Sequence, residues 1–130
     1  MGYEPVSNAE NEIARKIVAA AYRVHSNLGP GLLESVYEIC FCHELERLGL
    51  VHERQVEIPI VYDGFTLPGN LRLDVLVEKL VICELKAVET MNAVYLAQLL
   101  TQLKLTKRRL GFLINFNVPV IKLGIKRVVN

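Results

Sequence analysis

Asp74, Glu84 and Lys86 have the side-chain types and the spacing of a hydrolytic site that works with a metal ion. Two carboxylates held side by side repel each other, and each raises the pKa of the other unless a cation lies between them. Oxygen ligands of this kind suit a hard divalent ion such as Mg²⁺ or Mn²⁺. A nearby lysine can orient a metal-bound water or stabilise charge on a phosphate. The alternative interpretation is a ladder of solvated charges on an exposed sheet face.

The segments that carry these residues are predicted to form a β-hairpin. Residues 71–77 and 81–88 alternate between apolar and other side chains, which is the pattern of a strand with one buried face. If both apolar faces pack on one core, Asp74 lies directly opposite Glu84, and Arg72 lies opposite Lys86. This register requires a loop of odd length, such as residues 78–80, or a bulge.

The elements that position this hairpin can be predicted from periodicity and from end signals. A capping box at Ser7 and Glu10 and the pair Gly29-Pro30 bound the first helix, and Gly49 ends the second. The predicted order is α-α-β-β-β-α-β-β in a single domain of residues 1–130. The fold class is α/β or α+β, with a mixed, mostly antiparallel sheet and at least one crossover helix. The predicted elements are helices at about 8–28, 32–48 and 92–107, and strands around 56–60 and at 71–77, 81–88, 110–116 and 120–129.

Three groups of residues resemble one known family. Asp74, nine further residues and then Glu84-Leu85-Lys86 are similar to the D…(D/E)-x-K signature of the PD-(D/E)XK nuclease superfamily. Upstream, residues 31–37 match the G-x-x-E-x-x-Y pattern of the GxxExxY protein family, a branch of that superfamily. Residues 97–100 and 111–116 also look like later segments of the family. The resemblance runs from about residue 11 to residue 128.

The resemblance implies a restriction-endonuclease-like core and a nuclease activity that depends on Mg²⁺ or Mn²⁺. Asp74 and Glu84 would bind the metal, with the backbone carbonyl of Leu85 as a further ligand. Lys86 would be the catalytic lysine. Glu34, near the start of the second helix, would join the metal ligands directly or through water. The substrate would be DNA, with RNA as the less favoured choice.

Several further residues are candidates for positioning the substrate. Gln98 matches a helix glutamine that follows the lysine strand in such nucleases, but Gln102 stands where they often carry a tyrosine. The two glutamines are helix neighbours and could both reach a phosphate or the lysine. Arg72 is expected on the same face as Asp74. Tyr37 shares a helix face with Glu34, and its role is open between substrate contact and core packing.

The net charge of +1 hides an uneven distribution along the chain. Residues 1–89 hold all 14 acidic residues and 8 bases, giving −6, whereas residues 90–130 hold 7 bases and no acid, giving +7. A basic segment can contact phosphates, although bases at the end of a helix also simply favour the negative end of its dipole. The candidate nucleic-acid contacts are Lys104, Lys107, Arg108 and Arg109.

Other classes of protein fit the sequence less well. The apolar runs are too short to span a membrane, and the first residues contain no secretory signal. Three cysteines without such a signal indicate reduced thiols and a cytoplasmic location. A structural zinc site at Cys40, Cys42 and His43 is disfavoured, because side chains two apart on a helix point away from each other. The competing hypothesis is a catalytically silent module that binds nucleic acid or a protein partner, and a homodimer also stays open.

Overall fold

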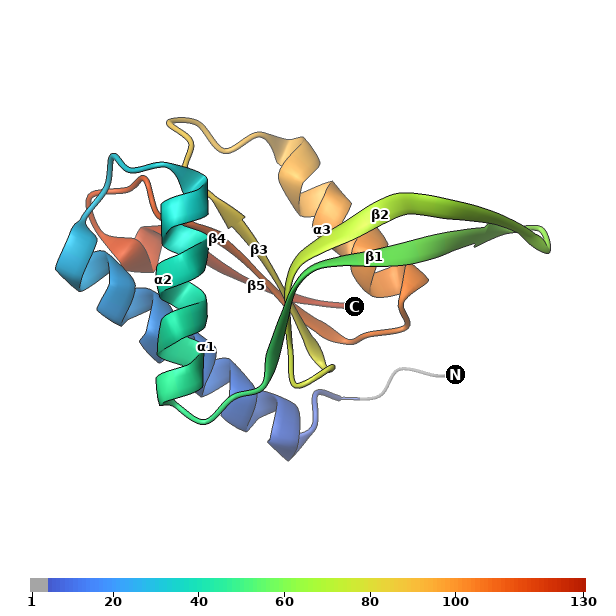
Figure 1. Cartoon of the computed structure of the whole chain (residues 1–130), viewed down its shortest axis with the longest axis horizontal. Helices are drawn as coiled ribbons and strands as arrows, with labels where there is room; N and C mark the ends of the chain where they lie inside the picture. The colour runs from blue at the N-terminus through green and yellow to red at the C-terminus, as the bar shows by residue number, and fades with distance from the viewer. Residues whose placement is uncertain (1–4) are drawn as a thin grey trace.

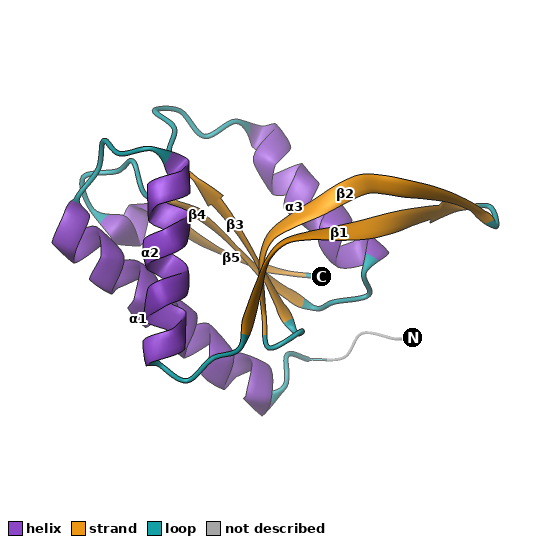
Figure 2. Ribbon diagram, viewed as in Figure 1, coloured by secondary structure: helices purple, strands orange, loops and turns teal. Residues whose placement is uncertain are grey.

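The computed structural model describes residues 5–130 and contains the predicted number of α-helices and strands in the predicted order (Figure 1). The expected mixed sheet flanked by helices is confirmed (Figure 2). No helix in the described part of the chain is long and apolar enough to cross a bilayer. The elements are α1 (Asn8–Leu28), α2 (Glu34–Arg47), β1 (His52–Tyr62), β2 (Phe65–Val77), β3 (Val81–Lys86), α3 (Ala93–Leu105), β4 (Leu110–Asn115), the short 3-10 helix η1 (Ile121–Gly124) and β5 (Ile125–Val129).

The sheet has five strands in the order β1-β2-β3-β4-β5. Neighbouring strands are antiparallel except β3 and β4, which are parallel and are joined through α3. A parallel pair needs such a crossover, because a short turn cannot carry the chain back to the starting edge. This connection places the start of α3 near the end of β3, where the candidate lysine lies.

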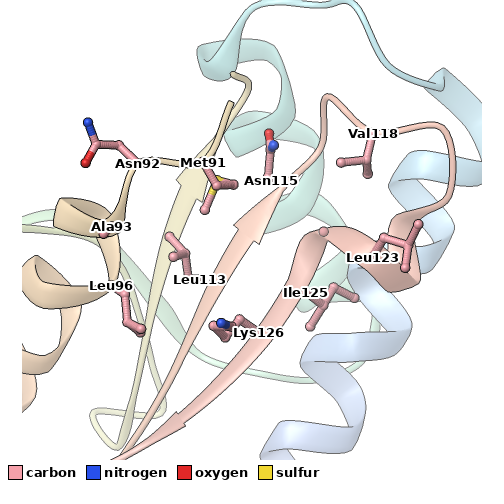
Figure 3. A pocket seen from close by; sticks show the side chains of 11 residues that line it. Met91, Asn92, Ala93, Leu96, Leu113, Asn115, Val118, Leu123, Ile125 and Lys126 are labelled. Carbon is pink, nitrogen blue, oxygen red and sulfur yellow. The ribbon is translucent and has the colours of Figure 1, made fainter. Parts of the chain in front are cut away.

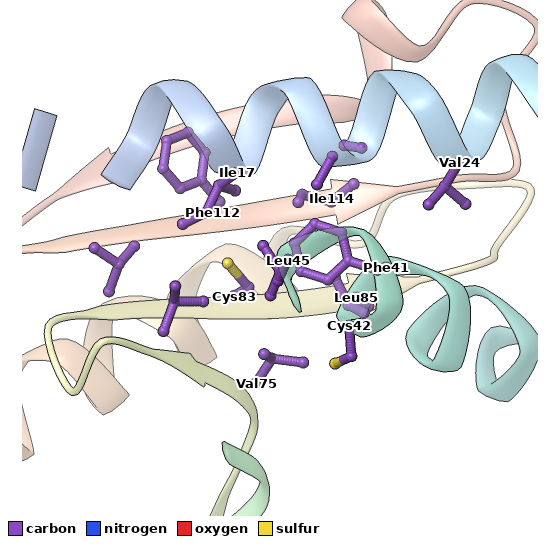
Figure 4. Packing of buried hydrophobic residues seen from close by; sticks show 14 of the residues in the cluster. Ile17, Val24, Phe41, Cys42, Leu45, Val75, Cys83, Leu85, Phe112 and Ile114 are labelled. Atoms are coloured by element: carbon purple, nitrogen blue, oxygen red, sulfur yellow. The ribbon is translucent and has the colours of Figure 1, made fainter. Parts of the chain in front are cut away.

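Helices cover both faces of the sheet and divide the interior into two apolar clusters. The larger cluster lies between α1, α2 and one face of β2, β3 and β4 (Figure 4). Phe41 and Leu45 of α2 pack there against Cys83 and Leu85 of β3. The smaller cluster lies on the other face, where Leu99 and Leu103 of α3 are buried. The strands β3 and β4 are thus buried on both faces, as expected for parallel neighbours in the middle of a sheet.

The first helix shows how local sequence sets an element. The hydroxyl of Ser7 accepts a hydrogen bond from the backbone N–H of Glu10, and the Glu10 carboxylate accepts one from the N–H of Ser7. This capping box satisfies two amides that lack partners inside the helix. At the other end Gly29 has a φ of 67°, a conformation that glycine adopts without a steric penalty.

The strands β1 and β2 extend far beyond the rest of the sheet and form an arm. In Figure 1 the arm crosses α3 and ends at the right of the molecule. Val56 and Ile58 at the base of the arm pack against the α3 cluster. Between Arg54↔Val75 and Val56↔Leu73 the β1–β2 ladder omits the pair Gln55 and Asp74, and Gln55 has a φ of 52°.

The prediction that one face of β2 is buried along its whole length is wrong, because the strand bends where this pair is missing. The alternation predicts Leu71, Leu73, Val75 and Val77 on a single buried face. Val75 and Val77 pack in the α1–α2 cluster, but Leu73 packs in the α3 cluster on the opposite face. The side-chain alternation therefore breaks around Asp74, at the point where β2 leaves the core sheet and enters the arm.

Several element boundaries also differ from the prediction. The second helix begins at Glu34 rather than near residue 32, and β1 and β2 are longer than expected because they build the arm. The third strand ends at Lys86 rather than Val88, whose backbone N–H and carbonyl bond instead to the side chain of Asn115. The last strand begins at Ile125, because residues 121–124 form η1.

Candidate active site

Asp74 and Glu84 are tied together by two hydrogen bonds between neighbouring strands. The backbone N–H of Asp74 donates to Oε2 of Glu84 at 3.0 Å. The backbone N–H of Leu85 donates to Oδ2 of Asp74, also at 3.0 Å. Each carboxylate thus binds the other strand's backbone through one oxygen. Side chain–backbone bonds replace the regular ladder here and hold the two carboxylates next to each other.

The predicted register of this hairpin is confirmed in part. The ladder pairs Val75 with Cys83 and Val77 with Val81, so the loop contains the three residues 78–80, as the buried faces required. Continuing the same register brings Asp74 level with Glu84. The ladder ends before Arg72, however, because β2 turns into the arm, and the expected pairing of Arg72 with Lys86 is not part of it.

Burial makes this carboxylate pair energetically costly when both groups are charged. Only 8% of Glu84 is exposed. Burial, together with the nearby charge of Asp74, raises the pKa of Glu84 to about 7, although bonds from Asp74 and Gln102 and the charge of Lys86 oppose the shift. Burial likewise raises the pKa of Asp74 above its ordinary value. The site therefore favours a proton or a cation between the two strands.

The start of α2 brings two more carboxylates into the same region. The pKa of Glu34 is raised by partial burial and by the charges of Asp74 and Glu38, while Lys86 lowers it. Glu38 lies one helical turn after Glu34 and is buried. Glu34 is thus within electrostatic range of Asp74 and Lys86, and its role as a metal ligand stays a prediction.

Glu38 is a member of the site that the sequence motifs did not identify. Its Oε2 accepts a hydrogen bond from Nε of Arg54 at 2.9 Å, and its Oε1 accepts one from Nε2 of Gln55 at 2.9 Å. The charge of Glu38 also raises the pKa of Asp74. Glu38 thus ties α2 to the bend in β1 that lies beside Asp74. Its four-residue spacing from Glu34 was the one available signal, because it places both on one helix face.

Lys86 lies at the end of β3 and contacts an aromatic ring on α3. Its Nζ is 4.5 Å from the centre of the Tyr95 ring, which is a cation–π distance. The positive charge of the ammonium group also acts on Asp74 and Glu84 and opposes part of the rise that burial causes in their pKa values. Tyr95 was not among the predicted site residues. It stands three residues before Gln98, on the helix where the expected tyrosine after Gln98 is replaced by Gln102.

The two candidate glutamines of α3 lie beside the carboxylates. Gln102 is only 5% exposed, and its side chain hydrogen-bonds Glu84, which lowers the pKa of that carboxyl group. Its Oε1 has no hydrogen-bond partner among the residues that the structure describes. Gln98 is exposed and lines, with Arg72, Glu84 and Gln102, a cavity of about 550 Å³ between β2 and α3. The predicted positioning residues Arg72, Gln98 and Gln102 are therefore brought together.

The residues present fit a divalent ion that keeps several waters. Asp74 and Glu84 supply adjacent carboxylates whose pKa values are raised mainly by burial, and for Glu84 also by the charge of Asp74, and a bound cation would favour their charged forms. The Oε1 of Gln102 is a buried acceptor that a metal-bound water could satisfy. Among residues 5–130, no three His, Cys, Asp or Glu side chains already stand close enough to hold an ion. Glu34 is therefore not part of a preformed three-carboxylate group with Asp74 and Glu84.

Tyr37, the tyrosine of the G-x-x-E-x-x-Y pattern, is part of the core. It is completely buried and its ring stacks on Phe116 with 4.8 Å between the ring centres. The hydroxyl donates to the carbonyl of Gly29 at 2.6 Å and accepts from the N–H of Leu32 at 3.1 Å. This burial supports core packing rather than substrate contact as the role of Tyr37. Tyr37 acts on the site indirectly, because it fixes the loop from which Glu34 begins α2.

The four candidate phosphate contacts lie at the far end of the sheet from Lys86. Val81 pairs with Leu110 and Lys86 pairs with Asn115, so the bases that precede Leu110 flank the start of β3. Arg108 donates from Nε to the carbonyl of Lys79 in the β2–β3 turn. Five strand steps separate this end from Lys86, a distance of about 17 Å. Whether Lys104, Lys107, Arg108 and Arg109 contact nucleic acid stays a prediction.

Comparison with known proteins gives one family. A sequence model described as the PD-(D/E)XK nuclease superfamily matches residues 11–128 of the chain. None of the curated proteins matches the chain. No solved structure matches it either. The matched range contains every predicted site residue, and the mixed sheet with its flanking helices is consistent with a restriction-endonuclease-like fold.

Proposed function

The chain belongs to the PD-(D/E)XK nuclease superfamily, and on that premise we propose that it is a nuclease that hydrolyses phosphodiester bonds with the help of Mg²⁺ or Mn²⁺. The observation that carries the proposal is the interlocked pair of the half-buried Asp74 and the buried Glu84, on which the charge of Lys86 acts and to which Gln102, with its unpaired Oε1, is hydrogen-bonded. A pair with uncompensated charge and little exposure is costly as a purely structural feature. The same pair is useful if it holds a cation.

The family match and the positions of the residues support the following roles. Asp74 and Glu84 would hold the ion, with the Leu85 carbonyl and Glu34 as further ligands. When bound, the ion lowers the pKa of a water and stabilises charge on the phosphate. Lys86 adds a positive charge on the same side of the sheet and is held there by Tyr95.

The helix glutamines and Arg72 act on the substrate side of the carboxylates. Gln102 orients a water through its unpaired Oε1. Arg72 and Gln98 line the adjoining cavity and bind phosphate or sugar of the scissile strand. We propose DNA as the substrate, with RNA second.

The proposal is tested by cleavage of plasmid, single-stranded DNA and RNA in the presence of Mn²⁺. The variants Asp74→Asn and Lys86→Gln should each lower the rate at least about a hundredfold, because each removes several kcal/mol of charge stabilisation. The matched control Lys122→Gln changes an exposed lysine on η1 and should cleave as the wild type does. Cleavage that is equal in the wild type and in Asp74→Asn would end the nuclease proposal.

A catalytically silent module that binds nucleic acid or a protein is the second candidate. It is favoured by one observation, that Glu34 does not form a ready three-carboxylate group with Asp74 and Glu84. Titration calorimetry with Mn²⁺ separates the two candidates. If the site is catalytic, the wild type binds Mn²⁺ and Glu84→Gln does not. If the chain is only a binding module, neither the wild type nor Glu84→Gln shows heat of binding.

We further propose that the chain falls in the GxxExxY branch of the superfamily. Support comes from Gly31, Glu34 and Tyr37, which form one unit: Tyr37 anchors the loop that contains Gly31 and thereby sets the start of α2 at Glu34. The cytoplasmic location stays a prediction, and its basis is that Cys40, Cys42 and Cys83 are all free thiols.

A further inference from the structure

The arm formed by β1 and β2 ends in an exposed apolar tip, residues 60–67. Tyr62 is 73% exposed and Phe65 is 65% exposed, and the two pair directly across the strands. Residues paired across an antiparallel ladder project to the same side of the sheet. The next pair on this side is Ile60 with Leu67. The tip therefore presents a continuous apolar face with two aromatic rings at its end.

The charge of the tip argues against nucleic acid as its partner. Residues 58–71 contain one charged side chain, Asp63, and no lysine or arginine. Binding to nucleic acid depends on bases that neutralise phosphates, even where aromatic rings stack on nucleotides. An exposed apolar face without bases is instead typical of a contact with another protein surface.

A cavity elsewhere on the same chain has an apolar lining with one basic side chain. It has a volume of about 440 Å³ and lies between the start of α3, β4 and the η1–β5 segment (Figure 3). The walls are mainly apolar, and Leu123 at the cavity is 77% exposed. Lys126 is the charged side chain of the lining. A lysine beside an apolar cavity suits an apolar tip that carries one aspartate.

The tip cannot reach this cavity within its own chain. In Figure 1 the arm extends to the right end of the molecule, whereas η1 lies at the left, beside α1 and α2. The base of the arm is fixed by its packing on the α3 cluster through Val56 and Ile58. If the tip enters such a cavity, it enters the cavity of a different molecule.

We propose that the tip of one copy of this chain enters the cavity of a second copy, and that the exchange is reciprocal. Tyr62 and Phe65 contact the apolar walls, and Asp63 lies near Lys126 of the other copy. Four aromatic side chains bury roughly 600 Å² or more, and the cavity walls that face them bring the contact to the roughly 1,000 Å² of a specific interface. Two identical contacts close the assembly as a dimer rather than an open chain. The proposal does not depend on nuclease activity.

Sedimentation equilibrium over a range of protein concentrations measures the assembly. The wild type should be a dimer, and the double variant Tyr62→Ser, Phe65→Ser should weaken dimerisation at least tenfold. These positions are exposed, so circular dichroism should show an unchanged fold. A wild type that is monomeric at every concentration, a species larger than a dimer, or a dimer that survives the tip substitutions would overturn the proposal.

A charge exchange tests the pairing of tip and cavity directly. Lys126→Glu and Asp63→Lys should each weaken the dimer, because each places like charges together at both contacts. An equimolar mixture of the two variants should form heterodimers, since both contacts then join opposite charges. The control Lys122→Glu, outside the cavity lining, should dimerise normally. A Lys126→Glu protein that dimerises like the wild type, or a mixture without heterodimers, would overturn the arrangement.

Discussion

Replacement of Glu84 by glutamine should stabilise the metal-free protein at alkaline pH, even though it removes a proposed metal ligand. Burial and Asp74 raise the pKa of Glu84 from its ordinary 4.5 to about 7. The folded protein therefore binds a proton that the unfolded chain has already released above pH 4.5. The contribution of protonated Glu84 to the free energy of unfolding is therefore fully present below pH 4.5. It falls as the pH rises toward 7 and is lost above that pH.

The size of this effect follows from the pKa interval. Each pKa unit corresponds to about 1.4 kcal/mol, so an interval from 4.5 to about 7 is worth about 3.5 kcal/mol at most. Glu84→Gln keeps the shape of the side chain and an acceptor for the N–H of Asp74, but it does not ionise. Its free energy of unfolding should therefore change much less between pH 5 and pH 8. Asp74, whose pKa is also raised by burial, leaves a slope of the same sign.

Urea denaturation in EDTA at about pH 5 and about pH 8 measures this difference. The matched control is Glu46→Gln, which makes the same change on the exposed surface of α2 and should behave as the wild type does. Addition of Mn²⁺ at pH 8 should stabilise the wild type and not Glu84→Gln, because an ion that binds only the folded state raises its stability by mass action. A wild type whose stability does not fall between pH 5 and pH 8, or a Glu84→Gln protein that is less stable at pH 8, would refute this account of the buried pair.

Three further substitutions test single contacts. Tyr95→Leu should lower the cleavage rate about twofold to thirtyfold, which is the range implied by a cation–π contact worth about 0.5–2 kcal/mol. The control Tyr95→Phe keeps the ring and should keep the rate. Equal rates in the two variants would show that Tyr95 has no role in holding Lys86. Glu38→Ala should lower the free energy of unfolding in urea by about 2 kcal/mol, because it removes the acceptor for Arg54 and Gln55. The affinity for Mn²⁺, measured by calorimetry, should fall as well. An unchanged affinity would show that the bend in the arm does not affect the metal site. Gly124→Ala should destabilise the protein by about 1–3 kcal/mol or more in the same urea assay, because a Cβ there overlaps the carbonyl oxygen of Asn115. An unchanged free energy of unfolding would show that η1 can shift to make room.

Much of the fold could be predicted because its signals are local. The capping box at Ser7 sets the start of α1, and the break at Gly29 sets its end. The odd loop at residues 78–80 follows from the two buried faces that it joins. The alternation of β2 failed at Leu73, next to the point where Gln55 of β1 leaves the ladder and bonds Glu38 of α2, and both of these residues are distant in sequence.

The same distinction separates what the sequence determined about the site from what the tertiary structure decided. The chain alone determined which side chains have metal-binding chemistry, and strand periodicity placed Asp74 beside Glu84. Only packing decided that Tyr95 contacts Lys86. Packing also directed Lys107 and its basic neighbours to the opposite end of the sheet, since α3 runs back along β3 before β4 begins. Periodicity is a property of neighbouring residues, whereas the end of the sheet that a residue occupies depends on how whole elements cross.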